Sequence, residues 1–198
     1  MNEQEIHQKH VKLLQELKLI INKTCARVIC SEPDILFEEN IIFFTKSFLI
    51  SICTYLESYL KDIAFSHINV VNDRLVNISI PYNLIKWNIL YPKEITDRDL
   101  KFENMKISIK AKDLDDHISA SPHRTESLFK KIGIDLTTVD GFLIKRELIK
   151  TIVLKRNNII HHNDNANDIS MIDLILYIDY FIEYMEIITQ VVKIENAK

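Results

Sequence analysis

Glycine and proline are scarce in this chain, which has two glycines and four prolines among 198 residues. All-β sandwiches and barrels need many tight turns, and those turns depend on these two residues. Long helices need few of them, so the scarcity favours helix. The chain also lacks a glycine-rich phosphate loop, a serine elbow and the paired histidines of zinc enzymes. These absences disfavour the common NTPase and hydrolase classes, and we expect no metal or cofactor.

Cysteine is also rare, and Cys25, Cys30 and Cys53 lack the CxxC spacing of zinc or redox sites. They lie among apolar residues, where thiols pack as small hydrophobes, so we expect reduced cysteines and a cytoplasmic protein. The acidic, polar residues 1–5 predict no secretory signal. Charged residues interrupt the most apolar runs, as Lys46 does within 41–53, so we expect no membrane span.

Charge is unevenly distributed along the chain. The net charge is −3, which disfavours indiscriminate binding to a polyanion. Residues 145–156, however, hold five bases and one acid, whereas residues 164–198 hold seven acids and two bases. Positive potential is therefore concentrated on one segment. The alternative is that these two segments pack together and neutralise each other.

Apolar residues recur at intervals of three and four along most of the chain, which predicts amphipathic helices. The predicted helices cover residues 3–30, 38–70, 122–132, 138–160 and 168–192. Ser121-Pro122 is typical of a helix start, and Gly133 of a helix end. The polar residues 161–167 predict an exposed turn, with Asn167 or Asp168 as the cap of the last helix.

Residues 72–120 are less regular, and the alternating stretch 105–110 is compatible with a short strand or an extended loop. No segment has the composition of a linker. We therefore predict one all-α domain over residues 1–198, an up-and-down helical bundle with an irregular insert around 72–120. Its last two helices should form an antiparallel hairpin.

Two charged residues interrupt apolar stripes. Ile149, Val153, Arg156 and Ile160 follow one another at intervals of three or four residues, which places Arg156 on the seam, the row of residues that faces the core. Glu57 interrupts a similar stripe. A buried guanidinium needs a partner, which suggests that Glu57 pairs with Arg156 or with Arg146. The alternative is that Glu57 lies at the edge of the bundle and reaches water.

The string from Leu154 to Asp164 places Arg156-Asn157 shortly before His161-His162, near the end of a predicted helix. Arginine binds phosphate in a planar fork, and histidine can transfer protons near pH 7. Asn157 and His161 would lie about 40° apart on a helix, but Arg156 and His161 about 140° apart. One helix cannot aim both at one phosphate unless it ends between them or a second copy supplies the other half.

The stretch from Leu154 to His161 resembles the Arg-x(4 to 6)-His motif of HEPN ribonucleases, including the asparagine after the arginine. Residues 49–63 and 121–134 resemble the RiboL-PSP-HEPN branch of that family. The resemblance implies an all-α domain that forms a homodimer in which two motifs line one composite cleft. It also implies a metal-independent endoribonuclease, acting as the effector of a toxin–antitoxin or phage-defence system, with a possible antitoxin or regulatory partner and no membrane.

In that cleft the RNA 2′-hydroxyl would be the nucleophile. Arg156 would bind the phosphate, His161 would act as general acid or base, and Asn157 would position the substrate. The expected substrate-binding residues are Lys155, Lys150 and Arg146, and Glu57 would orient Arg156.

Two departures from the family pattern concern regulation and the catalytic histidine. Asn163 occupies the position where some HEPN toxins carry a modified tyrosine, which disfavours regulation by tyrosine modification. His162 also satisfies the motif, but His161 is favoured because it shares a face with Asn157. Two other functions remain open, a non-catalytic interaction module and a binding site for a nucleotide or small ligand.

Overall fold

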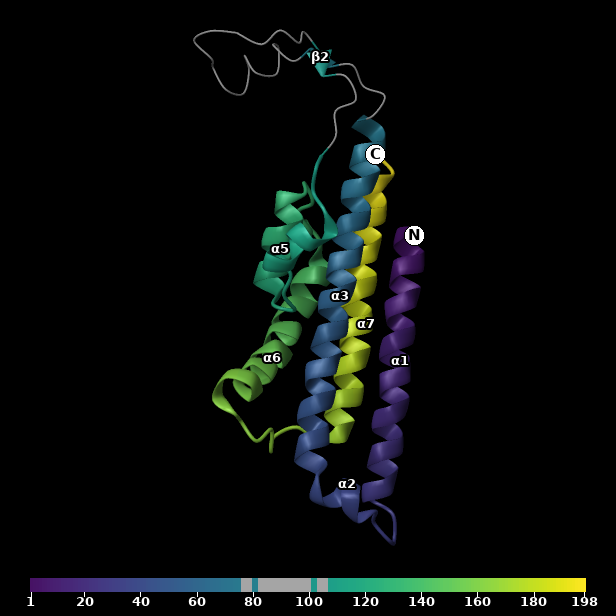
Figure 1. The fold of residues 1–198 in the computed structure, drawn as a ribbon, viewed down its shortest axis with the longest axis vertical. Coiled ribbons are helices and arrows are strands. Elements are labelled where there is room, and N and C mark those ends of the chain that lie inside the picture. The colour runs from purple at the N-terminus through teal and green to yellow at the C-terminus, as the bar shows by residue number, and fades with distance from the viewer. Residues whose placement is uncertain (76–79, 82–100, 103–106) are drawn as a thin grey trace.

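The computed structural model describes residues 1–75, 80–81, 101–102 and 107–198. The fold rests on four long helices: α1 (Glu3–Val28), α3 (Ile41–Leu75), α6 (Asp140–His162) and α7 (Met171–Asn196) (Figure 1). The shorter elements are α2 (Ile35–Glu39), η1 (Ala111–His117), α5 (Pro122–Lys131), η2 (Leu136–Thr138) and the two-residue antiparallel strands β1 (Ile80–Pro81) and β2 (Lys101–Phe102). The prediction of an all-α fold is confirmed.

Helices α3 and α7 form the centre of the bundle, with α1 packed on one side of them and α6 on the other (Figure 1). Helices α1 and α6 run in one direction and α3 and α7 in the other, so the long helices follow the predicted up-and-down order. Tyr59 of α3 is fully buried and donates its hydroxyl hydrogen bond to the Met185 carbonyl of α7 at 2.8 Å. This buried bond joins the two central helices.

Helix α6 is longer at its C-terminal end than predicted. It continues through His162, because Asn163 takes the left-handed conformation (φ 52°) that closes the helix. Helix α7 begins later than predicted, at Met171. Ser170 and Asp173 bond reciprocally to each other's backbone N–H, so the cap is Ser170 rather than Asn167 or Asp168.

The predicted helix at 38–70 is two helices, since α2 ends at Glu39 and α3 runs from Ile41 to Leu75. Residues 72–75 of the expected irregular insert are therefore helical. Within 105–110, residues 105–106 lie outside the described residues, and 107–110 form no regular element.

Helix α5 begins and ends close to the predicted positions. Ser121 is its N-cap residue and Pro122 its first residue, although the Ser121 side chain makes no capping hydrogen bond. Gly133 follows the helix with φ +90°, a conformation that glycine adopts without steric cost. The loop from Ile118 to Ser121 before α5 passes beside α3, where the backbone N–H of Ala120 contacts Glu57.

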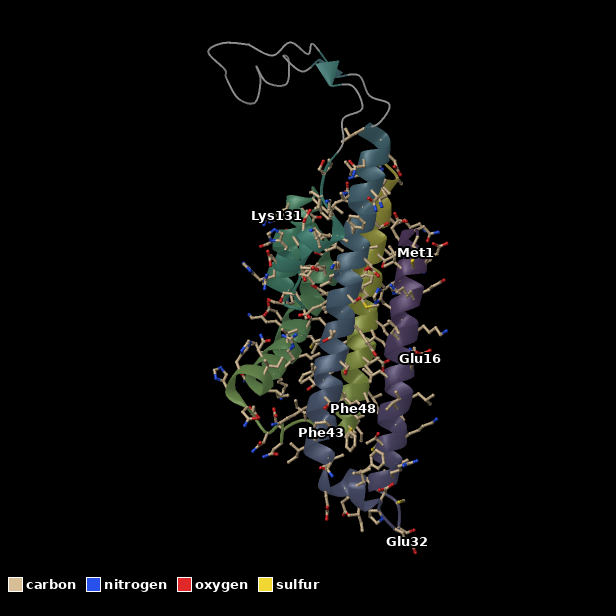
Figure 2. All side chains as sticks on the ribbon, in the orientation of Figure 1. Met1, Glu16, Glu32, Phe43, Phe48 and Lys131 are labelled. Carbon is tan, nitrogen blue, oxygen red and sulfur yellow. The ribbon has the colours of Figure 1, made fainter. Side chains whose placement is uncertain are left out.

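By length and composition alone, helix α3 is long and apolar enough to cross a bilayer. The sequence predicts no membrane span here, because Lys46 interrupts the apolar run at 41–53. The central helix of a water-soluble bundle passes the same test, and α3 packs against α1, α6 and α7. Leu49 and Leu56 are fully buried in these contacts. At the α2 end of the molecule, Phe48 is buried while Phe43 is exposed (Figure 2).

Candidate functional site

Arg156 of α6 forms an ion pair with Glu57 of α3. Its Nη2 donates to both carboxylate oxygens, at 3.3 Å to Oε1 and 3.4 Å to Oε2. The Arg156 side chain is 19% exposed and that of Glu57 24%, so both lie at the rim of the core rather than in open water. The expected pairing of Glu57 is present, and its partner is Arg156. Arg146 instead pairs with Glu126 and Glu147.

Glu57 has a second contact that fixes its position. Its Oε1 accepts the backbone N–H of Ala120 at 3.1 Å, in the loop before α5. Ala120 is fully buried, so this contact lies inside the protein. One carboxylate therefore joins α3, α6 and the loop before α5, which holds the guanidinium in a fixed orientation.

The remaining donors of Arg156 point in different directions. Its Nη1 donates to Oδ1 of the neighbouring Asn157 at 3.1 Å. Its Nε is buried and has no hydrogen-bond partner among the described residues. A buried, unpaired donor costs about 1–3 kcal/mol, so Arg156 is kept in place at some expense to stability.

Cys53 lies beside this ion pair but is unsuited to nucleophilic chemistry. Burial raises the pKa of its thiol to about 12, and the nearby charge of Arg156 only partly opposes that effect. The thiol is therefore protonated at neutral pH, and nucleophilic attack requires the thiolate. Cys53 is a packing residue of α3, as expected.

The seam of α6 differs from the predicted one by a single residue near its end. Ile149 and Val153 are buried as expected, but Ile159 is buried where Ile160 was predicted, and Ile160 is 45% exposed. The next buried residue after Arg156 lies three positions on rather than four, and this spacing keeps the buried face of α6 turned toward α3 and α7. Arg156 remains on that face.

His161 and His162 lie in the last turn of α6, and both are exposed. Because the helix is uninterrupted from Arg156 to His162, Arg156 and His161 lie about 140° apart around its axis and about 7.5 Å apart along it. The guanidinium faces α3 while His161 faces outward. The possibility that the helix ends between these two residues is therefore excluded.

The three predicted substrate-binding residues do not share one face of α6. By helical spacing, Arg146 and Lys150 lie within about 60° of Asn157 and His161, whereas Lys155 lies about 120° from His161. Lys155 forms an ion pair with Asp168 in the loop before α7. This hydrogen bond raises the pKa of Lys155 and lowers the pKa of Asp168.

A family model named RiboL-PSP-HEPN matches residues 8–193. The chain belongs to the RiboL-PSP-HEPN family. A search of curated proteins and a search of solved structures each found no match. HEPN domains are all-α and are generally associated with ribonuclease activity, so the family agrees with the fold and with the general class of activity. The roles of the individual motif residues stay predictions.

The basic residues of segment 145–156 of the HEPN domain are largely paired within the chain. Two of these bases form ion pairs with the acidic C-terminal segment: Lys145 pairs with Glu183, and Lys155 pairs with Asp168. The expected alternative of mutual neutralisation is therefore correct for these two. Sequence reasoning missed Asp168 as a partner and missed the Ala120 N–H, because neither contact has a recognisable spacing in the sequence.

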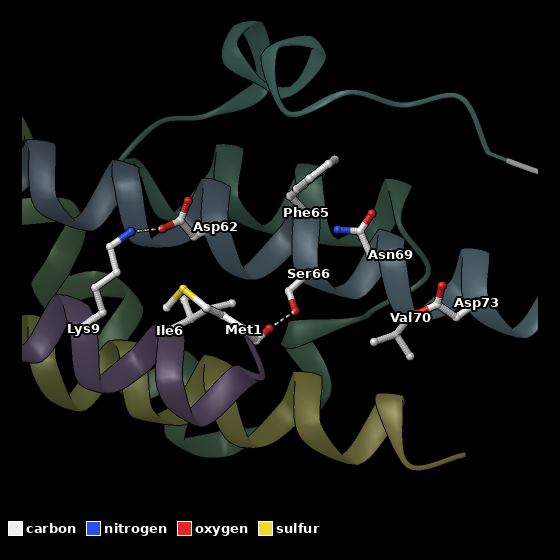
Figure 3. Close-up of a pocket in the computed structure, with 9 residues that line it drawn as sticks. All are labelled: Met1, Ile6, Lys9, Asp62, Phe65, Ser66, Asn69, Val70 and Asp73. Atoms are coloured by element: carbon white, nitrogen blue, oxygen red, sulfur yellow. Dashed lines mark hydrogen bonds and ion pairs between the residues drawn. The ribbon is translucent and has the colours of Figure 1, made fainter.

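A pocket of about 430 Å³ opens between α1 and α3 of the HEPN domain, and it contains no residue of the Arg-His motif (Figure 3). At its edge, Lys9 donates to Asp62 at 2.8 Å, and the same oxygen lies 2.9 Å from Nε2 of the fully buried His10. His7 Nε2 lies 3.2 Å from Glu186. Within the described residues, no group of three His, Cys, Asp or Glu side chains could hold a metal.

Proposed function

We propose that the protein is a metal-independent endoribonuclease that acts as a homodimer. The observation that carries the proposal is the arrangement of Arg156 and His161 on one continuous helix. Arg156 is directed toward α3 by Glu57, and His161 lies about 140° away on the exposed side. A single protomer cannot direct both groups at one phosphate. A symmetric dimer supplies the missing group from its second copy, so each site would combine Arg156 of one protomer with His161 of the other.

The reaction would use the RNA 2′-hydroxyl as the internal nucleophile. A histidine accepts the proton of the 2′-hydroxyl while its oxygen attacks the adjacent phosphorus. The bond from phosphorus to the 5′-oxygen breaks, and that oxygen takes up a proton, which leaves a 2′,3′-cyclic phosphate and a 5′-hydroxyl. No water or metal is consumed in these steps, and DNA, which lacks the 2′-hydroxyl, is not a substrate.

Each motif residue has a distinct part in this scheme. His161 serves as the general acid or base, a role worth about 10² to 10⁴ in rate. Arg156 stabilises the charge that develops on the phosphate, and such a contact is worth about 10² to 10³. Asn157, which accepts from Arg156 in the described protomer, positions the substrate or the guanidinium. Membership of the HEPN family also supports a role as a toxin or phage-defence effector with an antitoxin or regulatory partner.

The direct test is RNA cleavage in EDTA. The wild type should cleave RNA, with loss of activity in Arg156→Ala and in His161→Ala, while His162→Ala should stay active. His123→Ala is the matched control, because His123 is an exposed histidine on α5. Cleavage that persists unchanged in both Arg156→Ala and His161→Ala would refute the assignment.

A second candidate function is a non-catalytic α-helical interaction module, and the Arg156–Glu57 ion pair favours it because that pair also explains Arg156 structurally. Under this hypothesis Arg156→Ala lowers the melting temperature, His161→Ala does not, and neither affects an activity. Thermal melts of the two variants, measured beside the cleavage assay, separate the two functions.

A further inference from the structure

Every base between Lys145 and Arg156 has a carboxylate partner in the same protomer. The pairs are Lys145–Glu183, Arg146–Glu126, Arg146–Glu147, Lys150–Glu147, Lys155–Asp168 and Arg156–Glu57. The local positive charge seen in the sequence is therefore partly neutralised within the chain. A phosphate that binds one of these bases must share the cation with a carboxylate or replace that carboxylate.

Glu147 is a carboxylate of α6 that lies close to the face carrying His161. By helical spacing, Glu147 lies about 40° from His161, with Lys150 and Arg146 on its flank. Its Oε2 is 3.2 Å from Nζ of Lys150, and its Oε1 accepts from Nε of Arg146 at 3.1 Å. One acid thus holds two of the cations that share a face with Asn157 and His161.

These contacts are exposed, so an RNA phosphate can replace them. The Glu147 side chain is 60% exposed and that of Lys150 59%. Exposed ion pairs contribute about 0–1 kcal/mol, and an RNA phosphodiester carries the same single negative charge on two oxygens as the carboxylate, so exchanging one for the other costs little. Lys150 has no other ion-pair partner among the described residues, and its side chain is more exposed than those of Lys145 (25%) and Lys155 (26%), so it is the cation most readily released.

The position of Lys150 also indicates how much RNA is needed to reach it. Lys150 and His161 are eleven residues apart on one helix, which separates them by about 16 Å along the axis. That distance exceeds the reach of a single nucleotide at the scissile phosphate. A single-stranded RNA that continues for several nucleotides past the cleavage point would reach it.

We propose that Glu147 is a specificity-determining residue that occupies a phosphate position on α6 and is displaced by single-stranded RNA extending beyond the cleavage point. The inference rests on the proposed ribonuclease function and adds a binding position remote from the chemistry. Glu147 limits the affinity for longer RNA and leaves binding at the scissile phosphate unchanged. Short substrates, which do not reach Lys150, are unaffected by it.

The test measures the affinity of Glu147→Gln for a labelled 2′-O-methyl RNA oligonucleotide, which cannot be cleaved, and for the matching dinucleotide. We expect the variant to bind the oligonucleotide two- to about fivefold more tightly than the wild type does, and the dinucleotide equally well. The gain should disappear at high salt. Asp179→Asn is the control, because it makes the same change in net charge but breaks a pair with Lys18 of α1.

The outcomes separate this inference from the proposed function. Cleavage of unmodified RNA by the wild type, together with equal oligonucleotide affinity in Glu147→Gln and the wild type, overturns the inference alone. An equal gain in Asp179→Asn overturns it as well, since the effect would then be one of net charge. If the wild type neither cleaves nor binds RNA and Glu147→Gln does not bind it, both proposals fail. Thermal melts establish that each variant is folded.

Discussion

Mixing two inactive variants should restore ribonuclease activity if each site combines residues from two protomers. Arg156→Ala and His161→Ala should each be inactive alone, because every site then lacks one of its two groups. In a mixed dimer, one site joins the intact Arg156 of one chain to the intact His161 of the other. The second site lacks both groups.

The size of the recovery follows from this arrangement. Random assembly at equal concentrations makes about half of the dimers mixed, and one of the two sites in each is intact, so the mixture should show about one quarter of wild-type activity. Either variant alone should show about 1% or less. The contrast is therefore at least about twenty-five-fold.

The assay is cleavage of a fluorogenic RNA in EDTA after the two variants have been unfolded and refolded together, so that subunits exchange. The control replaces one partner with the double variant Arg156→Ala/His161→Ala, which cannot rebuild a site with either single variant. If the mixture is no more active than the sum of its components, the pairing of Arg156 and His161 across the dimer is wrong.

The remaining predictions concern the ion pair and a buried histidine. Glu57→Gln keeps an acceptor for the Ala120 N–H but leaves Arg156 without its counter-charge, so it should lower the free energy of unfolding by about 1–3 kcal/mol and lower kcat more than it raises KM. Urea titration and steady-state kinetics measure these effects, and an unchanged kcat would contradict a positioning role. Burial lowers the pKa of His10, although Asp62 opposes the shift. The unfolded chain therefore takes up this proton first, so the free energy of unfolding should decrease as the pH falls from above about 6.5 toward the lower folded pKa. Urea titrations between neutral and mildly acidic pH should show a smaller decrease in His10→Asn; an equal decrease would mean that other groups cause it.

Periodicity predicted the long helices because burial of a continuous apolar face dominates their placement. The helix ends were harder to predict, because they depend on single contacts. Ser170 caps α7 through its reciprocal bond with Asp173, whereas Asn167 and Asp168 have the same preference for that position in sequence. The end of α6 depends on Asn163, one of several polar residues in a row that could have adopted the left-handed conformation.

The ion pair of the candidate site was predictable because two charged residues interrupt apolar stripes. A charge on a seam requires a partner, and few acids in the chain occupy such a position. The contact of Glu57 with Ala120 was not predictable, because a backbone N–H has no signature in the sequence. The partners of Lys150 and Lys155 illustrate the same division. Glu147 lies one helical turn from Lys150 and could have been found from spacing, whereas Asp168 depends on the path of a loop.

The double role of Glu57 has a consequence for the entropy of substrate binding. A free arginine side chain samples many rotamers, and immobilising it costs up to about 2 kcal/mol. Here that cost is incurred during folding, because Glu57 is anchored by the Ala120 backbone and in turn holds the guanidinium. Arg156 is therefore preorganised before any second copy or RNA arrives, and the binding free energy of a phosphate need not include the ordering of this side chain.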